Sequence, residues 1–195
     1  RESLRVIVQS SDTIRQLVDE FVSVARMPGP RLRSGNILET LQLTVAGFAD
    51  NAEHICVELE YWNSDEKMFL PLTSSENMPM LVFNYDPEQI ARAFFNLISN
   101  AVSASAENTA ERRVVVRAKG PSPGSPEAEF SVTDWGHGIP ESARERIFEP
   151  YFSTKRTGTG LGLVIVQQIV HEHGGRLRVS ANEPRGTVFT MSLPV

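Results

Sequence analysis

The chain has 195 residues, of which 41% are hydrophobic, enough to bury one core of ordinary size. Nineteen Lys and Arg against 24 Asp and Glu leave a net charge of -5, which argues against a nucleic-acid partner. The sequence contains neither an apolar run of about 18 residues nor an export signal, and its single cysteine, Cys56, excludes an internal disulfide.

The first 28 residues have the pattern of a long helix that is apolar on one side. Its apolar side chains recur at heptad-like spacing, at Ile7, Ile14, Leu17, Phe21 and Val24. Such a helix either pairs with a partner helix or lies on its own domain. Pro28 and Pro30 end the pattern, and we expect residues 29–35 to form a linker. Because the chain opens inside a helical pattern, we expect it to be a fragment of a longer protein.

Helices and strands follow each other through the rest of the chain. Helical periodicity predicts helices at 36–50, 86–105 and 160–173. The second of these has a clear start, because Asp86 is an N-cap, Pro87 suits the first helical position and Gln89 completes a capping box. Alternation predicts strands at 54–61, 80–85, 113–119, 127–134, 176–181 and 187–193, with a polar stretch at 63–79. The prediction is an α/β (α+β) two-layer sandwich, an antiparallel or mixed sheet with helices on one face.

Two asparagines lie on one face of the helix predicted at 86–105. Asn96 and Asn100 are four residues apart, beside the apolar stripe of that helix. Two amides at the rim of a buried helix need partners, and their carbonyl oxygens suit a hydrated Mg²⁺ ion that accompanies a nucleotide. The alternative is a pair of solvated surface amides.

Asp134 ends a predicted strand and is followed by glycines at positions 136 and 138. A carboxylate fixed at a strand end can accept a hydrogen bond from an exocyclic amine, and glycines allow main chain to approach a flat ring. A simple Asx turn is the alternative.

Residues 136–160 form a long segment rich in Gly and Pro, with at most one predicted helical turn, which is typical of a functional lid or of disorder. Its aromatic residues Phe148, Tyr151 and Phe152 either pack on a ligand or form a small core cluster under the loop. Lys155 carries a charge suited to phosphate oxygens.

Gly158, Gly160 and Gly162 stand directly ahead of a helical apolar run. Glycine destabilises helices, so we expect the backbone to approach a ligand here, and a helix N-terminus favours phosphate. A dinucleotide fingerprint does not fit, because no strand precedes these glycines and the final glycine of that motif is missing. A P-loop does not fit either, since no Gly-Lys-Ser/Thr occurs.

In this order, the motifs resemble the catalytic, ATP-binding domain of sensor histidine kinases, over residues 36–195. The four matching boxes are Asn96-Leu-Ile-Ser-Asn100-Ala, Asp134-Trp-Gly136-His-Gly138, Phe148-Glu-Pro-Tyr-Phe and Gly158-Thr-Gly160-Leu-Gly162-Leu. Residues 1–28 are similar to the second helix of the dimerisation and phosphoacceptor hairpin, closest to the nitrogen-regulation branch. The resemblance implies a Bergerat-type fold with a lid at about 136–160.

The resemblance also implies which residues bind ATP and Mg²⁺. Asp134 would hold the adenine amino group with help from Thr187, Asn100 would be a metal ligand, and Asn96, Lys155 and the main chain at Gly160–Gly162 would face the phosphates. The full implied set is Asn96, Asn100, Asp134, Gly136, Gly138, Ile139, Phe152, Thr154, Lys155, Gly158, Thr159, Gly160, Leu161, Gly162 and Thr187. Ser103 departs from the family, many members of which carry a basic residue there.

The expected activity is transfer of the γ-phosphate to a histidine that this chain lacks. None of His54, His137, His171 and His173 has the sequence context of a phosphoacceptor. The implied partners are ATP, the acceptor hairpin of the same kinase, a response regulator and a second copy of the intact protein. We expect a cytoplasmic domain, whose parent could be anchored in the inner membrane. The alternatives are an ATPase of the same superfamily, in which a glutamate at the position of Asn96 activates water, and a pseudokinase that only senses nucleotide.

Overall fold

The computed structural model describes residues 28–50, 54–73, 78–106, 111–153 and 158–195. The helix expected at the N-terminus falls on residues 1–27, outside the described part of the chain. None of the helices within the described ranges has the length and apolar character needed to cross a membrane.

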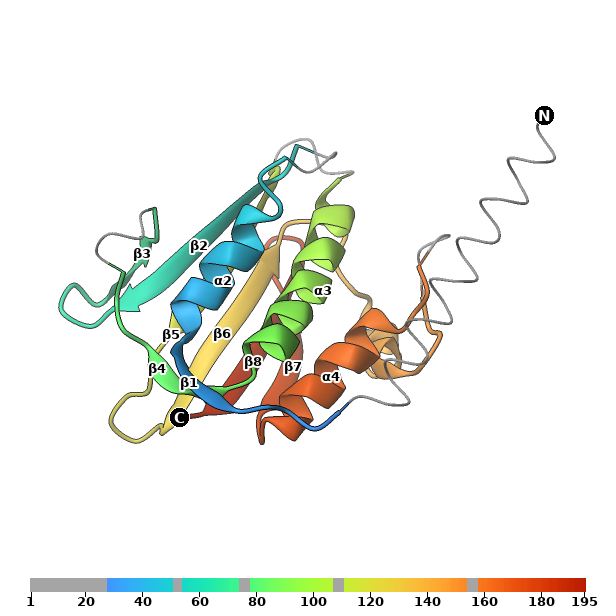
Figure 1. Ribbon diagram of the computed structural model, residues 1–195. Helices are drawn as coiled ribbons and strands as arrows, with labels where there is room; N and C mark the ends of the chain where they lie inside the picture. The colour runs from blue at the N-terminus through green and yellow to red at the C-terminus, as the bar shows by residue number, and fades with distance from the viewer. Residues whose placement is uncertain (1–27, 51–53, 74–77, 107–110, 154–157) are drawn as a thin grey trace, which may run out of the picture.

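A six-stranded mixed sheet forms one layer of the molecule, in the order β3-β2-β5-β6-β8-β7. Its strands are β2 (Cys56–Asn63), β3 (Met68–Pro71), β5 (Arg113–Lys119), β6 (Glu127–Asp134), β7 (Arg176–Ala181) and β8 (Thr187–Pro194). The β2–β5 pair is parallel and the other pairs are antiparallel. Helices α2 (Ile37–Ala46), α3 (Pro87–Ser105) and α4 (Gly162–Glu172) cover one face of this sheet, as Figure 1 shows. The predicted two-layer sandwich is confirmed.

Helix α3 is the central element of the helical layer. The Asp86 side chain caps its first turn, accepting hydrogen bonds from the N–H groups of Glu88 and Gln89, as predicted. The predicted capping box is not completed by Gln89, because the Asp86 N–H donates to His173 and the Gln89 amide donates to Pro28. Its predicted apolar stripe is buried, at Ile90, Ala93, Phe94, Leu97, Ile98 and Ala101. Phe94 packs edge-on against Phe130 of β6, with 6.0 Å between ring centroids. Helix α3 is thereby fixed over the strand that ends in Asp134.

Two short strands were not predicted. Strand β1 (Arg33–Asn36) falls at the end of the stretch expected to be a linker, and it pairs with β4 (Val82–Tyr85) in a separate two-stranded sheet. Strand β3 lies within the stretch expected to be polar and irregular, and pairs with β2. Its Phe69 stands opposite Trp62, and the two rings meet edge-on at 5.2 Å. Strand β1 depends on a pairing partner that is distant in sequence, whereas β3 pairs with the strand directly before it.

The segment expected to be a lid contains more regular structure than predicted. It holds two short 3₁₀ helices, Glu141–Ala143 and Arg146–Phe148, where at most one turn was expected. Ile147 is buried. The segment is therefore anchored to the domain by Ile147 and by the half-buried side chains of Ile139, Phe148 and Phe152.

Candidate functional site

Asp134 lies buried at the end of β6, with 3% of its surface exposed. The backbone N–H groups of Gly136 and Thr187 both donate to its Oδ1 atom, at 2.8 and 3.2 Å. The Thr187 side chain is a further hydrogen-bond partner of the carboxylate. The first glycine motif and the start of β8 therefore meet at Asp134, as the sequence suggested.

The pKa of Asp134 is raised above its ordinary value by burial. The hydrogen bonds from Gly136 and Thr187 and the nearby His137 oppose this shift without cancelling it. A buried carboxylate of this kind has lost hydrogen bonds from water, so a ligand group that donates a hydrogen bond to it is bound favourably. An exocyclic amine of a purine is such a donor.

Gly136 passes so close to the end of α3 that a side chain would not fit. A Cβ atom at this position would lie 2.3 Å from the carbonyl oxygen of Ala104. Gly138 has a positive φ of 75°, and a Cβ atom there would lie 3.2 Å from the carbonyl oxygen of Gly186, in the turn before β8. Ile139 is half-buried and packs against the core. These glycines bring the main chain after β6 onto both α3 and the turn before β8.

The second group of predicted residues meets where α3 passes the start of α4. A Cβ atom on Gly162 would lie 3.2 Å from Oδ1 of Asn96. Asn96 is held in place because its Nδ2 donates to the carbonyl oxygen of Arg92 at 3.0 Å. The first asparagine of the helix motif and the last glycine of the Gly-rich stretch are therefore neighbours, although 66 positions separate them in the sequence.

Helix α4 begins without a side-chain cap from the described residues. Its N-cap position is Leu161, which is 1% exposed, whereas α2 and α3 are capped by Asn36 and Asp86. The Thr159 hydroxyl accepts a hydrogen bond from Leu161 N–H at 3.4 Å, one residue before the helix. The first N–H groups of α4 and its positive dipole end thus remain suited to an anion.

The two ends of the site are joined by α3. Ala104, next to Gly136, and Asn96, next to Gly162, are eight residues apart, which corresponds to about 12 Å along a helix axis. Asn100 lies midway between them and is half-buried. The arrangement suits an elongated ligand with a flat hydrogen-bonding end and an anionic end.

The predicted lid aromatics are partly accounted for by packing. Phe148 and Phe152 pack against the core, and the Arg146 guanidinium lies 4.5 Å from the centre of the Phe152 ring. Tyr151 is 60% exposed, with a φ of 66°, and its N–H donates to the carbonyl oxygen of Gly160 at 3.2 Å. The two phenylalanines therefore form part of the core under this segment.

Gly160 has a φ of 71°, and a Cβ there would lie 2.5 Å from the carbonyl carbon of Tyr151, so glycine is required. Gly158 is exposed beside the undescribed residues 154–157. The predicted site residues Thr154 and Lys155 lie among those residues, outside the described part of the chain.

Sequence reasoning missed the turn before β8 as a support of Asp134. The Asn182 side chain donates from Nδ2 to the carbonyl oxygen of Asp134 at 2.9 Å. Gly186 has a φ of 122°, and a Cβ there would lie 2.0 Å from that same oxygen. The only signal was Gly186 between the two predicted strands at 176–181 and 187–193, which does not reveal the contact of Asn182 with Asp134 across 48 positions.

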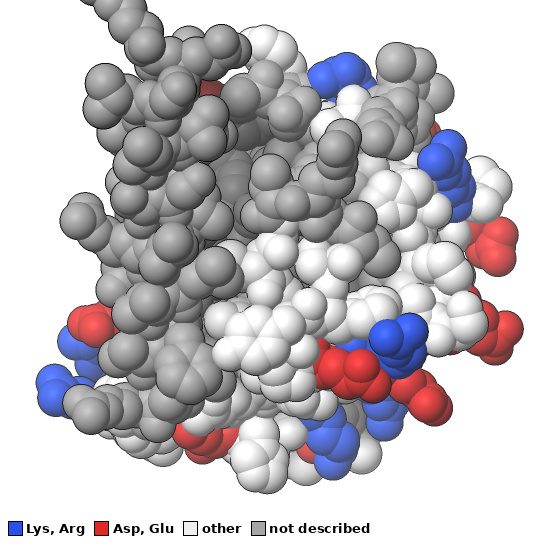
Figure 2. Space-filling model, turned by 90° about the vertical axis from the view of Figure 1, so that its right-hand side faces the viewer, with Lys and Arg blue, Asp and Glu red and all other residues white. Residues whose placement is uncertain are grey.

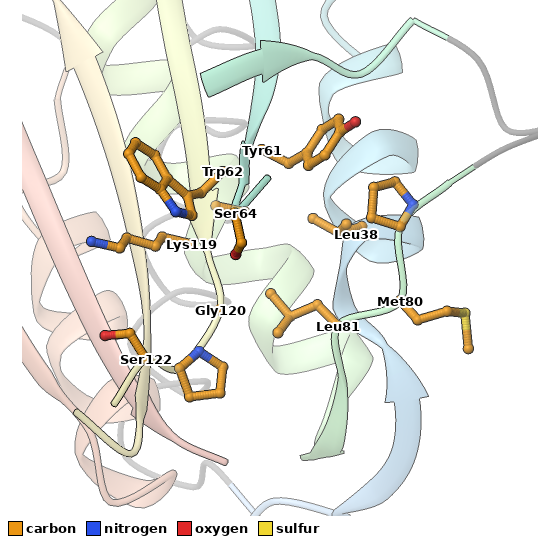
Figure 3. Close-up of a pocket in the computed structure, with 12 residues that line it drawn as sticks. Leu38, Tyr61, Trp62, Ser64, Met80, Leu81, Lys119, Gly120 and Ser122 are labelled. Atoms are coloured by element: carbon orange, nitrogen blue, oxygen red, sulfur yellow. The ribbon is translucent and has the colours of Figure 1, made fainter. Parts of the chain in front are cut away.

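A hollow of about 280 Å³ lies at the end of the sheet away from Asp134. It is lined by Leu38, Tyr61, Leu81, Lys119 and Gly120, among others, and Figure 3 shows these around the end of β5. Asp134 pairs with the start of β5, so this hollow is separate from the predicted site. It contains none of the predicted binding residues. On the α4 side of the molecule, Figure 2 shows Lys and Arg interspersed with Asp and Glu on the described surface.

Comparisons with known proteins agree with this geometry. The family described as Histidine kinase-, DNA gyrase B-, and HSP90-like ATPase matches residues 85–195, more than half of the chain. Sensor histidine kinase ZraS of Salmonella typhi is 29% identical over 194 residues, which are 100% of this chain and 38% of that protein. Nitrogen regulation protein NtrY of Azorhizobium caulinodans is 31% identical over 192 residues, 96% of this chain and 22% of that protein. The chain thus spans well under half the length of these relatives.

Solved structures share the fold. Full-length ShkA in complex with AMPPNP has a TM-score of 0.76 at 23% identity, covering 100% of this chain and 38% of that one. Histidine kinase ThkA in complex with the response regulator protein TrrA has a TM-score of 0.71 at 22% identity, covering 100% and 51%. The predicted resemblance is confirmed: the chain belongs to the histidine kinase-, DNA gyrase B-, and HSP90-like ATPase family, with sensor histidine kinases, including a nitrogen-regulation protein, among its relatives.

Proposed function

We propose that this chain is the ATP-binding catalytic core of a protein-histidine kinase, which donates the γ-phosphate to a histidine on a segment outside these 195 residues. Asp134 and the Thr187 hydroxyl bind the adenine amino group, with Gly136, Gly138 and Ile139 against the ring. Asn96 and the main chain from Gly158 through Thr159, Gly160, Leu161 and Gly162 bind the phosphates. In transfer, an imidazole nitrogen forms the new bond to phosphorus as the bond to the β-phosphate oxygen breaks and ADP leaves.

The position of Asn96 at the proposed phosphate-binding end of the site is the observation that favours phosphotransfer over ATP hydrolysis. Its Nδ2 donates to the Arg92 carbonyl and its Oδ1 faces Gly162. An ATPase needs a base here to take a proton from water, and an amide cannot accept that proton at neutral pH. The site is therefore built to hold the triphosphate rather than to activate water.

Mg²⁺ is the metal that fits this site. Within the described ranges, no three His, Cys, Asp or Glu side chains come together as a metal site. A magnesium ion here would be held by the Asn100 amide oxygen, by nucleotide phosphates and by water, the oxygen ligands it prefers. When bound, it would neutralise charge on the phosphates during transfer. Phe152, Thr154 and Lys155 complete the proposed set from the lid side.

The proposed partners follow from the relatives. ThkA is solved with a response regulator, and we expect this chain to act with an acceptor hairpin, a response regulator and a second copy of the intact protein. The N-terminal residues 1–28 would supply the second helix of that hairpin. The domain would work in the cytoplasm, where ATP is available, whether or not the parent is anchored in the inner membrane.

The experiment mixes the chain with γ-labelled ATP and a separate hairpin that carries an acceptor histidine. Acid-labile label on the hairpin is the expected result, and the Asp134→Asn chain should label it more slowly. Release of inorganic phosphate without label would indicate an ATPase. Nucleotide binding with neither product would indicate a pseudokinase, and either result would overturn the proposal.

A further inference from the structure

The residues that join the N-terminal segment to the domain are held by specific contacts. We call residues 28–36 the strap. The Gln89 amide donates from Nε2 to the carbonyl oxygen of Pro28 at 2.9 Å, and the Arg31 N–H donates to Oδ2 of Asp86 at 2.8 Å. The strap then continues as β1 along β4. In Figure 1 this blue segment runs past the end of α4 before it enters β1.

The last residue of the strap, Asn36, is fixed from three directions. Its Oδ1 accepts the Leu81 N–H at 3.0 Å, its Nδ2 donates to the Pro79 carbonyl at 3.0 Å, and its own carbonyl accepts the Tyr85 hydroxyl at 3.2 Å. The strap is therefore attached along its length, at residues 28, 31 and 33–36. This is not the behaviour of a free linker.

Asp86 uses its two oxygens for two separate tasks. Oδ1 caps α3 by accepting from Glu88 and Gln89 N–H at 3.0 and 3.1 Å, and Oδ2 accepts from Arg31. Together these backbone donors hold the pKa of Asp86 below its ordinary value, although burial alone would raise it. The carboxylate is thus charged under ordinary conditions and able to hold the strap.

The same residue also connects to α4. The Asp86 N–H donates to Nε2 of His173 at 3.1 Å, and His173 Nδ1 lies 2.7 Å from the Ile169 carbonyl oxygen. His173 is buried at the C-terminal end of α4. The strap is therefore bonded directly to the start of α3 and is connected to α4 only through the main chain of Asp86. Helices α3 and α4 carry Asn96 and Gly162, two of the residues proposed to bind the phosphates.

We propose that Asp86 and Gln89 are positioning residues for phosphotransfer: by holding the strap on α3, they fix the direction in which the preceding chain meets the domain and thereby set the approach of the bound phosphates to the acceptor. This inference rests on the proposed kinase function. A tethered acceptor reacts at an effective concentration set by the geometry of its connection, and a misplaced one reacts far more slowly.

Asp86→Asn separates the two tasks of the side chain. Asparagine keeps an oxygen for the helix cap, where it is as good as aspartate, but its NH₂ group cannot accept the Arg31 N–H. Gln89→Met removes the donor to Pro28 at similar size. Glu88→Gln is the matched control, because it removes a carboxylate from the same turn without a contact to the strap.

The test measures autophosphorylation of the intact kinase, with its own hairpin, beside labelling of a separate hairpin by the 195-residue chain. In Asp86→Asn and Gln89→Met, we expect the turnover number of the intact kinase to fall about tenfold, with the KM for ATP within twofold of the parent value. Labelling of the separate hairpin, whose acceptor is not joined through the strap, should stay unchanged. Glu88→Gln should match the parent in both reactions.

Three results would overturn the inference: an unchanged or increased turnover number in the intact kinase, an equal loss with the separate hairpin, or a loss explained by a raised KM. An equal loss of activity in the two reactions would indicate that the residue only stabilises the fold. A lowered midpoint of thermal unfolding would indicate the same. If the unsubstituted protein gives no labelled histidine, either in the intact kinase or on the separate hairpin, the proposed function is overturned, and this inference with it.

Discussion

Gly136 lies directly against Ala104, at the point where the main chain leaving β6 passes the C-terminal end of α3. A Cβ atom at 136 would be 2.3 Å from the Ala104 carbonyl oxygen and 2.8 Å from the Ala104 Cβ. Both are parts of a regular, packed helix, so neither can move without cost. The glycine therefore sets the distance between Asp134 and α3.

Gly136→Ala should both destabilise the domain and impair the site. Overpacking against backbone typically lowers the free energy of unfolding by about 1 to 3 kcal/mol, and the displacement would also move the carboxylate of Asp134. Thermal unfolding and calorimetric titration with ATP measure the two effects. Gly29→Ala is the control, because a Cβ there meets nothing within 4 Å, and it should change stability by less than about 0.5 kcal/mol. Equal behaviour of the two variants would contradict the close packing.

Asp134→Asn should weaken ATP binding while stabilising the free chain. The hydrogen bond from the adenine amine to a charged acceptor is lost, which reduces binding by about 1 to 3 kcal/mol. The buried charge itself opposes folding: because burial raises the pKa of Asp134 in the folded state, the folded protein binds more protons than the unfolded one over the range between the two pKa values. Stability due to this group therefore falls as pH rises through that range.

Above the folded pKa the penalty is fully present, so at neutral pH the asparagine variant should unfold at a higher temperature than the parent without nucleotide. Below the ordinary aspartate pKa of 3.8 the carboxyl is neutral in both states, and the difference should disappear. A variant that is less stable at neutral pH would show that the charged form contributes to folding.

The affinity for ATP should depend on pH in a manner that reflects the raised pKa of Asp134. The carboxylate form accepts the adenine amine more strongly than the neutral acid does. Binding should therefore weaken on acidification, beginning above the pH at which an ordinary aspartate titrates. Calorimetry at a series of pH values measures this, and Asp134→Asn should lack that part of the pH dependence. A parent and a variant with parallel profiles would assign the titration to another group.

The sequence was sufficient for those elements whose signals are local. The N-cap at Asp86 and the apolar stripe of α3 place Asn96 and Asn100 on one face without any tertiary information. The end of a strand at Asp134 is likewise predictable from the local sequence, because a glycine follows two positions later. The resemblance of these motifs to a known family then predicted that they form one ATP-binding site.

The sequence could not show contacts between residues that are far apart in the chain and have no distinctive local pattern of their own. Strand β1 looks like a linker because its four residues are polar or glycine, and it becomes a strand only through pairing with β4. The contact of Asn182 with the Asp134 carbonyl is of the same kind. Burial of Phe148 and Phe152 was also undecidable, because aromatic residues in a loop suit a ligand and a small core equally well.

Asn100→Ala should reduce the benefit of magnesium more than it reduces nucleotide binding itself. If its amide oxygen is a magnesium ligand, ATP affinity in excess Mg²⁺ should fall while affinity in EDTA stays near the parent value, since the adenine and the helix N-terminus are untouched. Titrations with and without the metal give both numbers. Ser103→Ala, one turn further along α3 and exposed, is the control. Equal losses in both conditions would exclude the ligand role.

Gly162→Ala tests the anionic end of the site with little effect on folding. A methyl group there would lie 3.2 Å from Oδ1 of Asn96, so the amide must shift by a few tenths of an ångström against its hydrogen bond to Arg92. Alanine is favoured over glycine in a helix by about 1 kcal/mol, which offsets this crowding. The free energy of unfolding should thus change by less than about 1 kcal/mol.

The same methyl group stands where the phosphates would meet the first turn of α4. The affinity for ATP should therefore fall, by about threefold to tenfold, whereas the affinity for adenosine, which ends at Asp134, should remain unchanged. Gly47→Ala at the C-cap of α2, with its Cβ 3.3 Å from the Thr44 carbonyl oxygen, reproduces the crowding on a different helix and should leave both affinities intact. An equal loss for adenosine and ATP at Gly162→Ala would mean that the α4 N-terminus shapes the whole pocket and does not bind the phosphates in particular.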